Sequence, residues 1–79
     1  MVAGVLMNVI LLLKVKAGRE EVLSEIRRLP GVVECNMVFG IYDAVVVLEG
    51  EERKVREAID SIRELPGVRI REELRERPL

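Results

Sequence analysis

The chain opens with a nearly uninterrupted apolar segment. Residues 5–16 are hydrophobic at almost every position until Lys14. A strand with one solvated face would alternate apolar and polar residues, whereas a strand covered on both faces is apolar throughout. The segment therefore predicts a strand with both faces covered. Residues 1–13 lack the basic leader and cleavage site of a signal peptide and are too short to span a bilayer.

Two amphipathic helices follow from apolar residues that recur at helical spacing. The first is predicted over residues 18–29, and the second opens at Gly50 and Glu51. Their apolar stripes consist of Val22, Leu23, Ile26 and Leu29 in the first helix and Val55, Ile59, Ile62 and Leu65 in the second. Each helix ends at a Pro-Gly pair, because proline disfavours helical geometry in the residue before it and glycine supplies a left-handed cap.

Three further strands are predicted around these helices. The second covers residues 32–39 and the third residues 42–49, with Gly40 and Ile41 at a tight connection between them. The last strand starts at Val68 and is much more charged than the first. Charge of that density is typical of an edge strand or of an exposed tail, where it prevents unwanted pairing.

The order of elements repeats. The heptapeptide that starts at Ile26 (Ile-Arg-Arg-Leu-Pro-Gly-Val) recurs at Ile62 as Ile-Arg-Glu-Leu-Pro-Gly-Val. Two strand-helix-strand units are too few for a stacked array and predict one α+β domain over residues 1–79, the ferredoxin-like βαββαβ sandwich with an antiparallel sheet. Both helices would lie on one face of the sheet. The other apolar face would then be an interaction surface, and a face-to-face dimer would cover it.

The composition of the chain limits its possible partners and its cellular environment. Thirteen basic residues nearly balance fourteen acidic ones, which gives no basic field for nucleic acid. Cys35 is the one cysteine, so no intramolecular disulfide can form, and this fits a reducing cytoplasm. We expect Cys35 to be a packed side chain. The abundance of Arg, Glu and branched aliphatic residues resembles proteins of hot environments.

Few residues are suited to catalysis or metal binding. The chain has no histidine, and Ser24 and Ser61 both fall inside predicted helices with no visible general base. No metal-ligand spacing is present. RNA-recognition modules share this element order, but they stack bases on aromatic residues of the central strands, and the aromatic residues here are only Phe39 and Tyr42. We therefore expect no enzyme, cofactor, metal site, or direct contact with nucleic acid or membrane.

The segment Phe39-Gly40-Ile41-Tyr42-Asp43 is the most distinctive one left. It is explained simply as a hairpin, with Gly40 at a positive-φ position and Asp43 in a local side-chain turn. Alternatively, a carboxylate at the start of an apolar strand needs a partner, and the ammonium group of a ligand could provide it.

The Gly-x-Tyr-Asp motif at residues 40–43, the apolar strand after it, and the Leu-Pro-Gly-Val that ends each helix together resemble the effector-binding domain of the Lrp/AsnC regulators, also called the RAM domain. The likeness covers essentially the whole chain. It implies dimers that stack their sheets and assemble into octamers or decamers, with amino acids or related small effectors bound at subunit interfaces near the motif. A helix-turn-helix domain precedes this one in full-length members, so the chain looks like a stand-alone effector domain that could join full-length regulators.

The resemblance places effector binding at Gly40, Ile41, Tyr42 and Asp43, with Gly40 shaping the loop, Tyr42 lining the pocket and Asp43 holding the amino group. Family members often have threonine or serine in the last strand, where this chain has Arg71, Glu72 and Glu73. Arg71 is therefore a further candidate for effector binding. Either the pocket prefers a different, charged effector, or the pocket is degenerate. Two other interpretations stay open: an assembly module that binds no ligand, and an ACT-like amino-acid-binding domain, whose ligand-loop glycine would correspond to Gly18.

Overall fold

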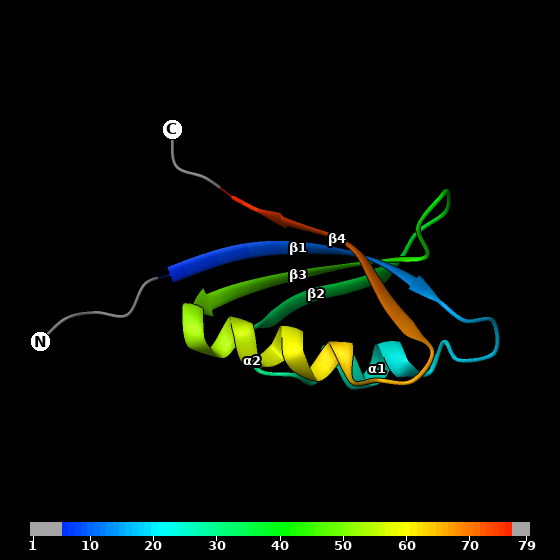
Figure 1. Ribbon diagram of the computed structural model, residues 1–79, viewed down its shortest axis with the longest axis horizontal. Helices are drawn as coiled ribbons and strands as arrows, with labels where there is room; N and C mark the ends of the chain where they lie inside the picture. The colour runs from blue at the N-terminus through cyan, green and yellow to red at the C-terminus, as the bar shows by residue number, and fades with distance from the viewer. Residues whose placement is uncertain (1–5, 77–79) are drawn as a thin grey trace, which may run out of the picture.

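The computed structural model describes residues 6–76. Within this range the chain forms, in order, β1 (Leu6–Val15), α1 (Val22–Arg27), β2 (Val32–Met37), β3 (Ala44–Glu51), α2 (Glu52–Arg63) and β4 (Val68–Arg75) (Figure 1). The strands make one antiparallel sheet in the order β2-β3-β1-β4. The predicted α+β class is confirmed, as is the position of the charged last strand at an edge. The predicted start of the first strand, at residue 5, lies outside the described residues.

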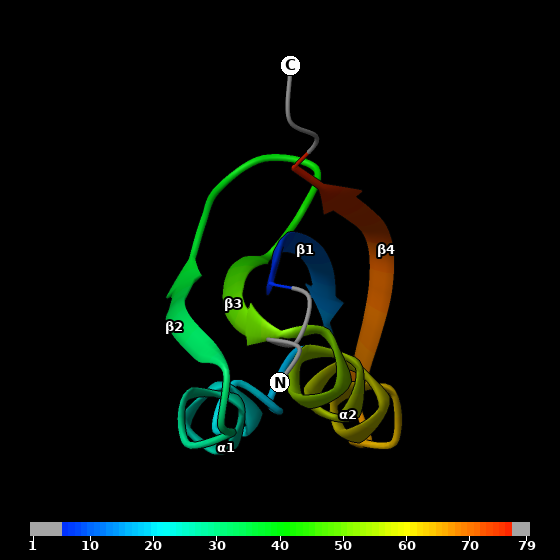
Figure 2. The ribbon, with the colours of Figure 1, turned by 90° about the vertical axis from the view of Figure 1, so that its left-hand side faces the viewer.

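Both helices lie on one face of the sheet. Figure 2 shows α1 beneath β2 and α2 beneath β1 and β4, with the β2–β3 connection on the opposite side of the sheet. The apolar stripes of the helices meet alternate residues of the two central strands, of which Val9, Leu11, Leu13, Val46 and Leu48 are fully buried. Burial of apolar side chains from both layers is the main stabilising contribution to such a domain.

The predicted left-handed glycine after each helix is confirmed, although α1 ends at Arg27 and α2 at Arg63, each before the residue that precedes the proline. Gly31 has a φ of +93° and Gly67 a φ of +83°, a conformation that glycine adopts without the steric cost of a Cβ. A Cβ at Gly67 would also lie 3.0 Å from side-chain atoms of Arg19. The repeated heptapeptide therefore reflects the same change of direction after each helix.

Several other predicted boundaries were wrong. β3 extends to Glu51, so α2 begins at Glu52 and not at Gly50. The first helix begins at Val22, not at residue 18, because Gly18 and its neighbours form turns in which the Glu20 carboxylate accepts the Gly18 N–H. β2 ends at Met37 and β3 begins at Ala44, so the connection is wider than a tight turn. The Val38 N–H donates to the Asp43 carbonyl, which closes a loop over residues 39–42.

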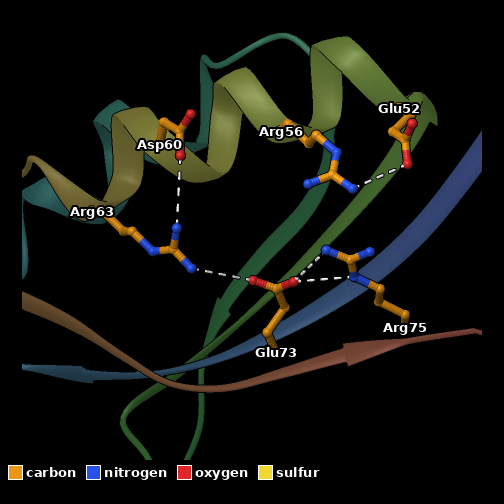
Figure 3. Close-up of polar contacts among 6 residues, drawn as sticks. All are labelled: Glu52, Arg56, Asp60, Arg63, Glu73 and Arg75. Carbon is orange, nitrogen blue, oxygen red and sulfur yellow. Dashed lines mark hydrogen bonds and ion pairs between the residues drawn. The ribbon is translucent and has the colours of Figure 1, made fainter.

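Charges on β4 fasten its edge to α2. Figure 3 shows Glu73 between two arginines, with Arg63 at 3.5 Å and Arg75 at 3.0 Å. Arg63 also lies 3.7 Å from Asp60. Glu73 is opposite Leu11 in the register, so its side chain points toward the helix layer, where a carboxylate needs partners. The two arginines provide them.

Candidate functional site

The face of the sheet opposite the helices carries a patch of aliphatic side chains. We call this patch the outer apolar face; its members are Ile10, Leu12, Val45, Val47 and Leu74. Ile10 pairs with Val47 on one side and Leu74 on the other, and Leu12 pairs with Val45, so the five residues adjoin one another. Ile10 is 40% exposed and Leu74 48% exposed. The expectation that the helices leave one apolar face of the first strand uncovered is confirmed for this chain.

A cavity of about 330 Å³ lies beside the β2–β3 loop. We call it the loop cavity; its lining residues are Lys14, Ile41, Tyr42, Arg71 and Glu72. Three of the five residues predicted from the sequence thus meet around one hollow, although Arg71 belongs to β4 and the other two to the loop. Lys14 and Glu72 complete the lining.

A β-bulge brings Glu72 into the loop cavity beside Arg71. Leu12 pairs with Glu72 but Leu13 pairs with Ile70, so Arg71 is an extra residue in β4 with no partner in β1. A bulge re-aims side chains, and bulges are common beside functional sites. Consecutive residues Arg71 and Glu72 consequently line the same hollow with opposite charges.

Tyr42 and Glu72 are connected across the loop cavity. The Tyr42 hydroxyl donates to Glu72 Oε2 at 3.3 Å. Desolvation, together with the charge and hydrogen bond of Glu72, raises the pKa of Tyr42 above its ordinary value, while Arg71 acts in the opposite direction. The hydroxyl therefore stays protonated and can donate at neutral pH.

Asp43 lies at the start of β3 and holds that strand to the end of β1. Its Oδ2 accepts the Val15 N–H at 2.8 Å and lies 3.5 Å from Lys14 Nζ, while its own N–H donates to the Leu13 carbonyl at 2.8 Å. The Val15 hydrogen bond is the main cause of a lowered pKa of Asp43, and Lys14 adds to it. At neutral pH the carboxylate is ionised and one of its oxygens is already engaged within the chain.

Gly40 lies in the loop but does not line the cavity. Its φ is +125°, a conformation that other residues rarely adopt, and a Cβ there would meet nothing within 4 Å. Its predicted role in shaping the loop fits this geometry. The neighbouring Phe39 is fully exposed and Ile41 is 77% exposed. The loop therefore presents two large apolar side chains to solvent.

Sequence reasoning missed Lys14 and assigned no role to Glu72. The alternating direction of side chains along β1 could have indicated Lys14, because Lys14 lies on the same face as Ile10 and Leu12. Glu72 could not be placed, because the bulge that turns it toward Tyr42 leaves no mark in the hydrophobic pattern.

Neither a metal centre nor a reactive thiol is found in the described part of the chain. Among residues 6–76 no three His, Cys, Asp or Glu side chains are grouped as metal ligands, and no helix has the length and apolar character to cross a membrane. Cys35 is 2% exposed, and burial raises the pKa of its thiol, with Arg27 acting against this. Its predicted role as a packed side chain is confirmed.

Comparison with known proteins gives no family assignment: no family model matches the chain, and no curated protein matches it. The resemblance to the Lrp/AsnC effector domain therefore depends on the motif at residues 40–43 and on the Leu-Pro-Gly-Val repeats.

Proposed function

We propose that the chain is a small-molecule-binding and oligomerising module of Lrp/AsnC type, with a ferredoxin-like βαββαβ fold and an amino acid or a related compound as its effector. The observation that carries the proposal is the outer apolar face with the loop cavity beside it. The proposed role is regulatory and not catalytic, and acts through partner regulators in the cytoplasm.

The outer apolar face is the proposed dimer interface. Contiguous aliphatic surface rimmed by polar residues is typical of a binding surface, and here Asn8, Glu49 and Glu72 border it. A domain of this size buries only about 60% of its unfolded surface, so burial of this face against a second copy would add substantial stability. Higher assembly into octamers or decamers is proposed from the family resemblance.

The loop cavity offers groups for both charged ends of an amino acid. The Arg71 guanidinium is suited to a carboxylate, since its fork of N–H donors matches the two oxygens. The Glu72 carboxylate is suited to an ammonium group, and Tyr42 and Ile41 would contact the side chain of the ligand. Asp43 stays a candidate for the ammonium group through Oδ1, but Oδ2 already accepts a backbone N–H.

The first experiment is a thermal-shift screen against the twenty amino acids, combined with light scattering of the free chain. A ligand that binds only the native state raises the unfolding midpoint. At a concentration of one hundred times Kd it adds about 2.7 kcal/mol to the free energy of unfolding. We expect one amino acid or a few to raise the midpoint. Arg71→Gln and Glu72→Gln should abolish this response, while Arg53→Gln on the exposed surface of α2 should retain it.

A second candidate function is assembly without a ligand. It is favoured by the Tyr42–Glu72 hydrogen bond and the Asp43–Lys14 ion pair, which already satisfy polar groups at the loop cavity. An oligomer that shows no thermal response to any amino acid would support assembly and contradict effector binding. A monomer at micromolar concentration would contradict both functions.

A further inference from the structure

Four basic side chains gather where β1 ends and β4 begins. Lys14, Lys16, Arg69 and Arg71 line a cavity of about 450 Å³ together with Gly67 and Val68. The whole chain has a net charge of only −1, so this concentration of positive charge is local. We call these four residues the basic cluster.

Strand pairing places two of these positive charges directly opposite each other. Lys14 is the cross-strand partner of Arg69 in the β1–β4 ladder, and like charges in that position destabilise a sheet. The Lys16 N–H donates to the Gly67 carbonyl at 2.8 Å, which holds the next basic residue beside the same pair. The fourth member, Arg71, is the extra residue of the bulge. The backbone therefore holds the cluster together against its own repulsion.

Little within the chain offsets this repulsion. Among residues 6–76, Lys14 has an ion pair with Asp43 at 3.5 Å, and no ion pair is formed by the other three members. Exposed basic residues such as Arg53 and Lys54 also form no ion pair in the described range, so the distinguishing feature of the cluster is that its four members line one cavity. A cavity lined by unpaired cations is suited to an anion from solution, because each guanidinium or ammonium can donate charge-assisted hydrogen bonds to it.

We propose that the basic cluster is a binding site for a small anion with two or more negative charges, of the phosphate or dicarboxylate type. Two unpaired arginines and a lysine next to a partly paired lysine exceed what one carboxylate needs. The site overlaps the proposed amino-acid site, because Lys14 and Arg71 line both cavities. Lys16 and Arg69 line only the cavity of the basic cluster and therefore distinguish the two sites. Nucleic acid is the less suitable occupant because the rest of the surface carries no basic excess to follow a duplex.

The test measures unfolding midpoints of the full chain in a low-salt buffer with inorganic phosphate, pyrophosphate or succinate, each against sodium chloride at the same ionic strength. We expect at least one of the three anions to raise the midpoint more than chloride does. Phosphate and succinate then distinguish a phosphate ligand from a dicarboxylate. No response beyond chloride from any of them would overturn the proposal.

Variants locate the effect. Arg69→Gln and Lys16→Gln should each weaken binding of the effective anion by about tenfold, the size expected for loss of one charge-assisted hydrogen bond. Lys54→Gln, which removes the same charge from exposed α2, is the matched control and should bind as the wild type does. Without any added anion, Arg69→Gln should have a higher midpoint than Lys54→Gln, since it removes the Lys14–Arg69 repulsion.

Two results would overturn the assignment to this cluster. One is an equal loss of anion response in Arg69→Gln and Lys54→Gln, which would show general screening of charge. The other is tighter binding of a short DNA duplex than of pyrophosphate at matched salt, which would assign the basic residues to nucleic acid. Failure of the amino-acid screen would leave the predicted anion response unchanged, so the two proposals fail separately.

Discussion

Leu11 and Leu12 are neighbours in β1, and the same substitution at each should have opposite consequences. Leu11 is fully buried beneath the helices, whereas Leu12 belongs to the outer apolar face. From the sequence, either residue could have pointed at a partner subunit. The structure assigns Leu11 to the core of the domain and Leu12 to the proposed dimer interface, so lysine substitutions separate folding from association.

The expected cost at Leu11 exceeds what the domain can tolerate. Loss of a buried leucine side chain costs about 2–5 kcal/mol, and an ammonium group left without a partner in the core costs several kcal/mol more. A domain of this length has a total stability of roughly 4–12 kcal/mol. We therefore expect Leu11→Lys to be unfolded by circular dichroism, and Leu11→Ala to be folded but destabilised by about 3 kcal/mol in denaturant titration.

Leu12→Lys should keep the fold and lose the dimer. The lysine stem can cover the same apolar surface while its charge reaches solvent beside Glu72, so the cost within one subunit is about 1 kcal/mol or less. Light scattering should show a monomer, and Ser24→Lys on the exposed side of α1 should leave the oligomer intact as a control. The reasoning is refuted if Leu12→Lys stays dimeric at micromolar concentration, or if it unfolds as Leu11→Lys does.

Three other predictions concern charged and polar side chains. Ultraviolet titration of Tyr42, the only tyrosine, should give a pKa above the ordinary value of about 10, and Glu72→Gln should lower this pKa. Because the folded pKa is raised, the contribution of Tyr42 to stability is present below about pH 10 and is lost as the pH rises through the folded pKa. Asp43 has a lowered pKa, so its contribution is present above about pH 4 and is lost as the pH falls through the folded pKa; melting curves of Asp43→Asn and the wild type should therefore converge in acid, and a constant difference would contradict this. Glu73→Gln should cost about 1 kcal/mol in denaturant titration and reduce the salt dependence of stability, while the exposed Glu64→Gln should have no effect.

The elements of this chain were predictable because their signals are local. The helical stripes, the Pro-Gly endings and the charged edge strand each depend on a few neighbouring residues, and the structure contains all of them. The start of α1 was missed although its cause is also local: the Glu20 carboxylate accepts the Gly18 N–H, and turns precede the helix.

The site was predictable only in part, because the hydrophobic pattern of β4 does not indicate its register. Ile70 and Leu74 are four residues apart and would share one face in a regular strand. The bulge at Arg71 places Ile70 against the core and Leu74 on the outer apolar face. The meeting of Arg71 and Glu72 with Tyr42 follows from that shift. The Asp43 carboxylate was expected in a local side-chain turn or beside the ammonium group of a ligand. It instead accepts the Val15 N–H, and that residue is too distant in sequence for the motif to indicate the contact.

The sheet joins the two halves of the chain in every one of its ladders. In the described residues β1 pairs with β3 and β4, and β2 pairs with β3, so each pairing connects a strand from before the loop at residues 39–42 with one from after it. Neither half can form any of this sheet alone. During synthesis, β1 and β2 must wait for β3 to emerge, and loop-closure entropy of this kind slows folding.

The same topology makes the loop at residues 39–42 a hinge for exchange. If it straightens, the first half of one chain can pair with the second half of another and form every strand contact in the register of the monomer. Two intertwined domains would result with no new interface to evolve.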